Sequence, residues 1–146
     1  MYTPEDIEKI VIDYLKPDLP NFISGNLTRK DERVSGSDED LTVGTLSLTD
    51  GNVQRGTVLI SIYLKDIQVR NEEAQKMDNK PNTARFDAIT RKIYEVLGGN
   101  AGRYWKFGNI WISNPSPLYA NVEAGEHFRS IRVEVKAHLP AEDPVL

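Results

Sequence analysis

One stretch, GTVLISIYLKDI at residues 56–67, restricts the fold of this chain more than any other. Successive side chains of an extended strand point to opposite faces of a sheet. One face of this strand would carry Val58, Ile60, Ile62 and Leu64, and the other would carry Leu59 and Tyr63. A strand that is apolar on both faces must be covered on both sides. The cover comes either from two layers of the same chain or from one such layer and a partner protein.

Two other segments have the apolar period of an amphipathic helix, in which one stripe of side chains faces the core. The first runs from Pro4 to Leu15, with Thr3 suited to cap it. The second runs from Ala84 to Leu97 and is followed by Gly98, which favours the left-handed conformation that ends helices. Each stripe must be buried, so we expect both helices to pack on a sheet.

Strand signals occupy much of the remaining apolar sequence. Residues 41–48 and 53–65 flank TDGN, which contains an Asp-Gly turn signal, so we expect a hairpin. Residues 131–139 alternate apolar and polar side chains, which is typical of a strand with one dry face and one wet face. These elements predict an α+β fold with a mainly antiparallel sheet and two helices packed on one face. The chain has the length of one domain, which we expect to span residues 1–146.

The segment RYWKFGNIWIS, residues 103–113, repeats the two-sided pattern. Read as one strand, it places three aromatic side chains on a single face. Two packed helices cover roughly four strands on one side of a sheet only, because a helix is about 10 Å wide and strands lie about 4.8 Å apart. The other side then needs a second layer of this chain or a neighbouring subunit, and the sequence leaves both open. The candidate interface residues are Leu59, Tyr63, Trp105, Phe107 and Trp111.

Three segments have no clear apolar period. Residues 28–42 are charged, with little apolar character, and we expect a mobile surface loop. Residues 68–82 form a polar linker with enough helix-forming residues for a turn or two of helix. Residues 140–146 are predicted to be a frayed tail.

Composition excludes several classes of function. The chain has no cysteine, so it has neither a disulfide nor a thiolate metal site. Its formal net charge of −4 argues against direct nucleic-acid binding, which depends on clustered Lys and Arg. The first residues are acidic, unlike a signal peptide, and the longest apolar run is too short to span a membrane.

The residues that could carry chemistry are few. Neither His127 nor His138 has a second metal ligand at short spacing. The glycines of GGNAGR follow a helix, whereas phosphate-binding loops precede one, so we interpret them as a helix stop. The acids Asp38, Glu39 and Asp40 are consecutive and do not match a calcium loop. We therefore predict no catalytic residue, no cofactor and no metal, and expect a protein that is not an enzyme.

Four pieces of the sequence carry a family resemblance through their order: TPEDIEKIVIDYLK, QRGTVLISIYLKDI, RFDAITRKIYEVLGG and HFRSIRVEVKAHL. Together they resemble the tail-terminator, or tail-completion, proteins of long-tailed bacteriophages and prophages. The resemblance covers most of residues 3–139 as a pattern of elements without a diagnostic short motif. It implies a structural α+β subunit that forms a homo-oligomeric ring, ends the tail tube and docks head-completion proteins during virion assembly.

The resemblance also implies where the protein acts and what it contacts. Its partners would be copies of itself and other tail or head-completion proteins, in the cytoplasm during assembly and then in the virion tail. In such a ring, the negative charge of Asp38, Glu39 and Asp40 suits a loop that lines the lumen, because it discourages contact with DNA. The alternative hypothesis is a small-ligand-binding α+β module in which Tyr63, Trp105 and Trp111 line an aromatic pocket.

Overall fold

The computed structural model describes residues 1–34 and 38–139. Its helices are α1 (Pro4–Leu15), α2 (Leu19–Phe22) and α3 (Thr83–Val96), with three short 3-10 turns, η1 (Lys30–Glu32), η2 (Gly99–Ala101) and η3 (Val122–Ala124). The strands are β1 (Leu27–Arg29), β2 (Glu39–Leu48), β3 (Val53–Lys65), β4 (Ile67–Asn71), β5 (Lys76–Lys80), β6 (Arg103–Trp105), β7 (Gly108–Pro115), β8 (Tyr119–Asn121) and β9 (Glu126–His138).

The strands form one large sheet and one small one. The large sheet has the order β1-β2-β3-β9-β7-β6, with β8 paired to β9, while β4 and β5 pair only with each other. All pairs are antiparallel except β1 with β2. The predicted hairpin of β2 and β3 is present, and so is the predicted strand near the end of the described chain. The α+β prediction, with a mainly antiparallel sheet, is therefore confirmed.

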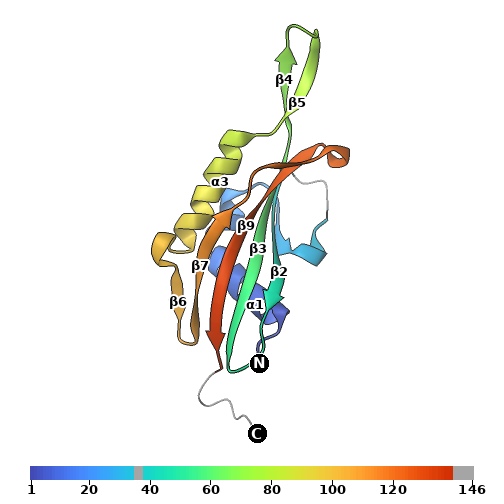
Figure 1. Ribbon diagram of the computed structural model, residues 1–146. Coiled ribbons are helices and arrows are strands. Elements are labelled where there is room, and N and C mark those ends of the chain that lie inside the picture. Colours follow the sequence, from blue (N-terminus) through green and yellow to red (C-terminus); the bar gives the residue numbers. More distant parts are fainter. Residues whose placement is uncertain (35–37, 140–146) are drawn as a thin grey trace.

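Helices α1 and α3 lie behind the large sheet, on the same face of it (Figure 1). Helix α1 starts at the predicted residue because Thr3 and Asp6 form a capping box, in which the Asp6 N–H donates to Thr3 Oγ1 and the Thr3 N–H donates to Asp6 Oδ2. Helix α3 ends at Val96, and Gly98 follows in the left-handed conformation with φ of 87°. Both helices agree with the predicted ranges to within one residue.

The hydrophobic core lies between these helices and the sheet. In β3, the residues Val58, Ile60 and Ile62 are fully buried and face the helices. Ile7 and Val11 of α1 are fully buried against the same sheet, as are Ile89 and Ile93 of α3. One apolar face of the two-sided strand is thus covered by the chain itself.

Two predictions for the weakly patterned segments are wrong. Residues 28–42 are not an irregular loop throughout, because they contain most of β1, all of η1 and the first part of β2, and only 35–37 lie outside the described residues. Residues 68–82 are not helical, because most of them form the β4–β5 hairpin, whose tight turn includes Gln75 at φ of 54°. Cross-strand pairing from Ile67 with Lys80 to Asn71 with Lys76 overrides the helix propensity of this segment. The predicted frayed tail, 140–146, lies outside the described residues.

The aromatic segment at 103–113 is also different from the prediction. It is a hairpin of β6 and β7, with Trp105 opposite Gly108, and it is not a single strand. A Cβ at Gly108 would lie 2.0 Å from the Lys136 carbonyl oxygen of β9 and 2.9 Å from the Trp105 ring, so only glycine fits between them. As a result, Trp105 packs against the helix-side core, whereas Trp111 aligns with Glu134 on the opposite face. The prediction that these two tryptophans share a face is wrong.

Candidate interaction surface

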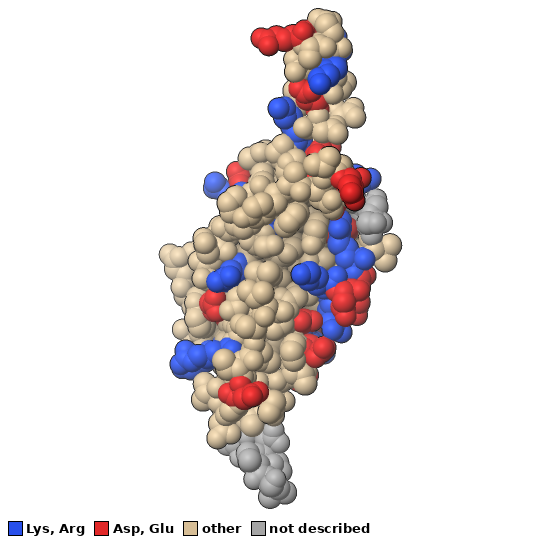
Figure 2. Space-filling view, turned by 45° about the vertical axis from the view of Figure 1, so that its right-hand side comes forward, with Lys and Arg blue, Asp and Glu red and all other residues tan. Residues whose placement is uncertain are grey.

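The sheet face opposite α1 and α3 is the part of the molecule on which a partner could bind. We call it the open face. It is formed by alternate residues of three neighbouring strands, Thr57, Leu59, Ser61 and Tyr63 of β3, Phe128, Ser130, Arg132 and Glu134 of β9, and Trp111 of β7. Figure 2 shows mostly uncharged surface over the middle of the body, with a few charged side chains within it and a larger mixed group of charges along the right-hand side. None of the helices α1, α2 and α3 lies on this face (Figure 1), although Lys30 of the 3-10 turn η1 packs over Gly44 of β2 on the same side.

One end of the open face is covered by aromatic rings and an arginine. The Tyr63 and Phe128 rings stack with their centroids 5.7 Å apart, and Tyr119 of β8 lies 5.6 Å from Phe128. The Arg33 guanidinium lies 3.9 Å from the centre of the Tyr63 ring. Tyr63 is therefore half-buried by its own chain, although Tyr119 remains 50% exposed beside it.

Arg33 also pairs with two buried carboxylates. It donates two hydrogen bonds to Glu126, at 3.2 Å and 2.9 Å, and one to Asp40 at 3.3 Å. The side chains of Asp40 and Glu126 are only 2% and 5% exposed. Asn26 and Asn121 donate further hydrogen bonds to these acids. This arrangement fastens the segment after η1 onto the open face and leaves no carboxylate of the pair available for a ligand.

Nearer the middle, the open face contains a hollow. The hollow has a volume of about 420 Å³ and is lined by Leu59, Ser113, Asn114, Ser116, Ser130 and Arg132. Two of its hydroxyls are already engaged, since Ser130 bonds to Ser61 and Ser116 accepts from the Ser130 N–H. Within the described residues, the exposed guanidinium of Arg132 makes no hydrogen bond or ion pair. The hollow thus presents one unpartnered positive charge among neutral polar groups.

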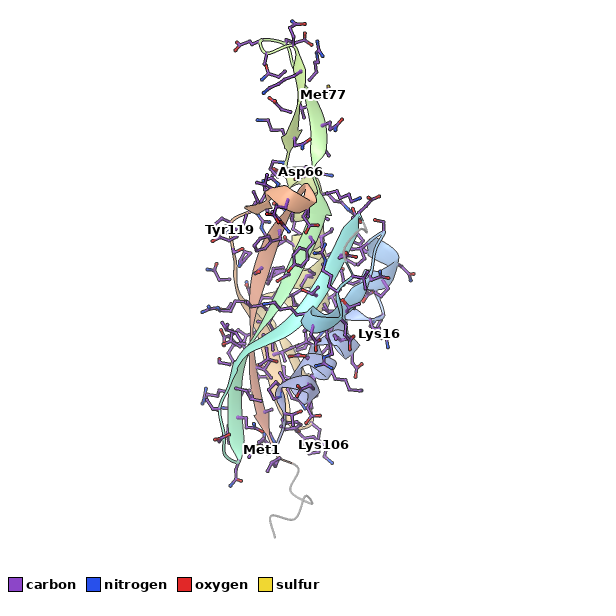
Figure 3. All side chains as sticks on the ribbon, turned by 90° about the vertical axis from the view of Figure 1, so that its right-hand side faces the viewer. Met1, Lys16, Asp66, Met77, Lys106 and Tyr119 are labelled. Carbon is purple, nitrogen blue, oxygen red and sulfur yellow. The ribbon has the colours of Figure 1, made fainter. Side chains whose placement is uncertain are left out.

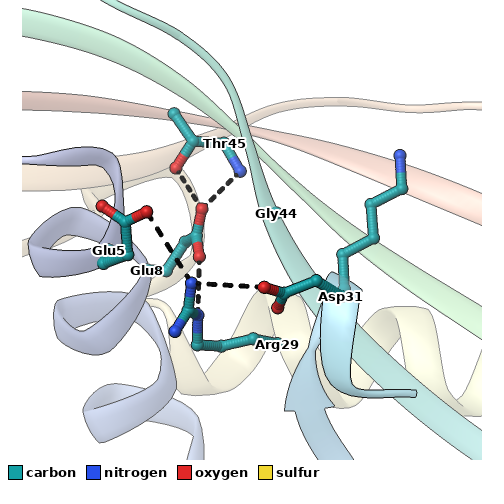
Figure 4. A pocket seen from close by; sticks show the side chains of 7 residues that line it. Glu5, Glu8, Arg29, Asp31, Gly44 and Thr45 are labelled. Carbon is teal, nitrogen blue, oxygen red and sulfur yellow. Dashed lines mark hydrogen bonds and ion pairs between the residues drawn. The ribbon is translucent and has the colours of Figure 1, made fainter. Parts of the chain in front are cut away.

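A second depression lies at the edge of the sheet, where β1 ends and β2 has no further strand on its outer side (Figure 4). Glu8 of α1 accepts hydrogen bonds from the Thr45 N–H at 2.9 Å and the Thr45 hydroxyl at 2.7 Å. The same carboxylate accepts a bond of 3.0 Å from Arg29. Glu8 is only 8% exposed and takes the place of a missing strand partner for the edge N–H. This depression is therefore a closed structural network.

The three acids predicted to line a ring lumen have different environments. Asp38 is exposed and lies 3.8 Å from the Lys65 ammonium. Glu39 accepts two hydrogen bonds from Arg85, at 2.6 Å and 2.9 Å, and Asp40 is buried beneath Arg33. Glu39 and Asp40 belong to β2, where side chains alternate, so they lie on opposite faces of the sheet. The acids do not form a single cluster.

The β4–β5 hairpin, which we call the arm, projects from the end of β3 beyond the body of the molecule (Figure 3). Ile67, Val69 and Met77 of the arm are 42%, 43% and 50% exposed. Asp66, at the base of the arm, has its carboxylate Oδ1 2.5 Å from Nδ1 of the His127 ring, and its N–H donates to the Gly125 carbonyl. The base is thus fastened, while the rest of the arm exposes apolar side chains.

The structure brings together only part of the predicted interface. Leu59, Tyr63 and Trp111 share the open face and are half-buried, while Phe107 lies in the β6–β7 turn with its ring edge-to-face against His138. Trp105 is on the helix side, so Tyr63, Trp105 and Trp111 do not surround one pocket. The predicted pocket is wrong for this reason.

Sequence reasoning missed Arg33, Arg132 and the arm. Ile67 and Val69 are apolar and two positions apart, which is typical of a strand and was the one signal for the arm. The charged residues that follow do not continue this pattern. Nothing in the sequence distinguished Arg33 and Arg132 from other surface arginines. Among residues 1–34 and 38–139, no group of three acidic or histidine side chains is placed to hold a metal. None of the described helices is long and apolar enough to cross a membrane.

Comparison of the sequence with protein-family models gave no match, and comparison with curated proteins gave none either.

Proposed function

We propose that this protein is a structural assembly subunit of a phage or prophage tail, which forms a ring that ends the tail tube and docks head-completion proteins. The family resemblance of the sequence suggests this role. The arm and the open face support it, because each is a surface that association with other chains would cover. The proposal requires no catalytic step.

The observation that carries the proposal is the arm. A two-stranded hairpin without a covering layer is marginally stable in water, since it buries little apolar surface. Both outer edges of the arm have unpaired backbone groups in the described chain, which favours pairing or packing with another protein. An arm with exposed Ile67, Val69 and Met77 is thus best explained by a partner that covers it.

The open face gives a second, independent reason. Leu59 and Trp111 are half-buried beside the hollow, and no second layer of the described chain covers them. Of the two kinds of cover that the sequence left open, a neighbouring subunit is the one that this arrangement favours. A closed ring uses two different surfaces of each subunit, and the arm and the open face are two such surfaces.

The test is deletion of the gene from its phage or prophage, followed by electron microscopy of the tails. Loss of a protein that ends the tail tube should give tubes of variable and excessive length, and expression of the intact chain should restore uniform tails. Purified chain added to tubes should appear as a ring at one end. Tails of normal length without the protein would contradict the proposal.

A matched pair of variants makes the test specific to the open face. Leu59→Asp places a charge in the middle of that face, whereas Lys9→Asp changes a side chain of α1 that is 75% exposed. We expect Leu59→Asp to fold but to leave tail length uncontrolled, and Lys9→Asp to behave as the parent. Circular dichroism checks that both variants are folded.

A further inference from the structure

We propose that the arm of one copy binds the open face of the next copy, with Glu72 and Glu73 of the arm tip facing Arg132 in the hollow. This inference rests on the proposed function, because it names the contact by which the ring would form. It names the arm as the donor surface, the open face of the next copy as the acceptor surface, and a charge pair between the two.

The charges of the two surfaces are complementary. The Glu72 side chain is 80% exposed and lies 3.8 Å from Arg70 of its own arm. Glu73 is exposed and has no ion pair within the described residues. Arg132 is the corresponding unpartnered cation on the open face. Glu73 and Arg132 are therefore opposite charges without a partner in the described part of each subunit, and such charges steer association and set the register of an interface.

The apolar parts of the two surfaces also correspond. Ile67 and Val69 lie on one face of the arm at alternate positions of β4, and Met77 lies on its other face. Leu59 lines the hollow on the acceptor side, and Trp111 lies in the neighbouring strand. An arm laid with its Ile67 and Val69 face against the open face would cover these two side chains and would leave Met77 on the outside. The hollow would then hold the polar tip.

The length of the arm suits this contact. Each arm strand has five residues, which corresponds to about 17 Å at about 3.3 Å per residue. The three strands β3, β9 and β7 span about 10 Å between their axes at about 4.8 Å per step. The arm is therefore long enough to lie across the strands that line the hollow.

The arm does not reach the open face of its own chain. It continues away from the body in the direction of β3 (Figures 1 and 3). Asp66 at its base is held by the Gly125 carbonyl and by His127, so folding the arm back would break both contacts. The acceptor must belong to another molecule. A second copy is the partner for which a complementary hollow is present.

The direct test is disulfide cross-linking, which is specific here because the chain has no cysteine of its own. One preparation carries Ala74→Cys at the arm tip, and a second, with a size tag, carries Ser113→Cys in the hollow. Both retain Glu72, Glu73 and Arg132. The mixture is oxidised mildly under two conditions, at high protein concentration and in the presence of tail tubes. In both we expect a mixed dimer of tagged and untagged chains.

A matched control places the second cysteine on the helix side. Lys9→Cys has an exposed side chain on α1, so random collision would cross-link it to the arm tip as readily as Ser113→Cys. We expect no mixed dimer with Lys9→Cys. Equal cross-linking of both positions would overturn the inference, and so would the capture of Ala74→Cys by a tail-tube protein in place of a second copy.

Charge reversal tests the pairing itself. Arg132→Glu should reduce the cross-linking yield by about tenfold, and so should Glu72→Lys combined with Glu73→Lys. A mixture in which the arm carries both lysines and the hollow carries Arg132→Glu should recover most of the yield. Arg55→Glu, a cation of the same face outside the hollow, is the control and should have little effect.

The two proposals fail in different ways. If rings form on tail tubes while the Ala74→Cys tip does not cross-link to Ser113→Cys, the arm contact is wrong and the proposed function stands. If the intact chain neither forms rings nor controls tail length but the tip still cross-links to the hollow, the contact is right and the proposed function is wrong. If neither occurs, both are wrong.

Discussion

At the scale of single residues, the clearest feature is that charged side chains connect segments far apart in the sequence. Arg85 of α3 donates to Glu39 of β2 and to the Phe22 carbonyl of α2, so one guanidinium joins three elements. The hydrogen bonds from Arg85 hold the pKa of the Glu39 carboxyl below its ordinary value of 4.5, the Ser24 N–H acts in the same direction, and partial burial opposes them.

This pKa shift predicts how stability depends on pH. A carboxyl with a lowered pKa in the folded state stabilises the fold above its unfolded pKa and loses that contribution as the pH falls through the folded pKa. We expect Glu39→Gln to reduce the free energy of unfolding by about 1–2 kcal/mol at pH 7. The difference from the parent should shrink as the pH falls below 4.5.

The measurement is urea denaturation of both proteins over a series of pH values. Asp38→Asn is the control, because the side chain of Asp38 is 76% exposed and only 3.8 Å from Lys65. If the unfolding free energies of Glu39→Gln and the parent differ by the same amount at pH 7 and below pH 4.5, the ion pair does not cause the difference.

A second prediction at this scale concerns Arg33. Arg33→Leu would leave Asp40 and Glu126 buried without their common cation, and removal of one partner from a buried ion pair costs on the order of 3–5 kcal/mol. We expect a large fall in the urea midpoint. Arg33→Lys keeps the charge but not the two-pronged geometry, so it should be intermediate. A urea midpoint unchanged by Arg33→Leu would show that Arg33 does not stabilise the fold.

At the scale of elements, the arm and the body are separate units. The body contains the whole hydrophobic core, whereas β4 and β5 pair only with each other. Local opening free energies are low where few apolar groups are buried. The arm should therefore contribute little to the stability of the body.

Removal of the arm tests this separation. Ile67 and Lys80 are paired across the hairpin, so residues 68–79 can be replaced by Asn-Gly, which closes a two-residue turn between paired positions. We expect the free energy of unfolding to change by less than about 1 kcal/mol, because no core residue is lost. Thermal denaturation followed by circular dichroism measures this. Loss of cooperative unfolding would instead show that the arm is part of the folded core.

At the scale of the whole molecule, the central property is that donor and acceptor surfaces are different. In a heterologous interface, each subunit contributes one surface to each of two neighbours. A subunit that lacks one surface can still use the other. This distinguishes the proposed contact from a symmetric dimer, in which both partners lose the same surface together.

Mixing two defective chains tests the heterologous contact. The arm-deleted chain keeps an intact open face, and Arg132→Glu keeps an intact arm. We expect each alone to stay monomeric, and the equimolar mixture to form a one-to-one dimer that does not grow into a ring. Mass photometry of the separate and mixed samples measures these species. Large assemblies of either chain alone would argue for a different interface.

The sequence by itself determined the body of this protein, because helix and strand periods are local properties of the chain. The stripes of α1 and α3 and the alternation of β3 and β9 specify which side chains face the core, and the caps at Thr3 and Gly98 specify helix ends. These predictions required no knowledge of how distant segments pack.

Only the tertiary structure decided which polar groups meet and which apolar side chains remain outside. Arg33 and Glu126 are 93 residues apart, and their contact depends on how a short turn crosses the sheet. Trp105 and Trp111 lie on different strands because the chain turns at Lys106 and Phe107, and the alternating pattern of residues 103–113 did not indicate this turn. The arm formed because β4 found a partner in β5, although residues 68–82 contain helix-forming residues. Cross-strand pairing outweighs helix propensity where a segment has little apolar surface of its own to bury.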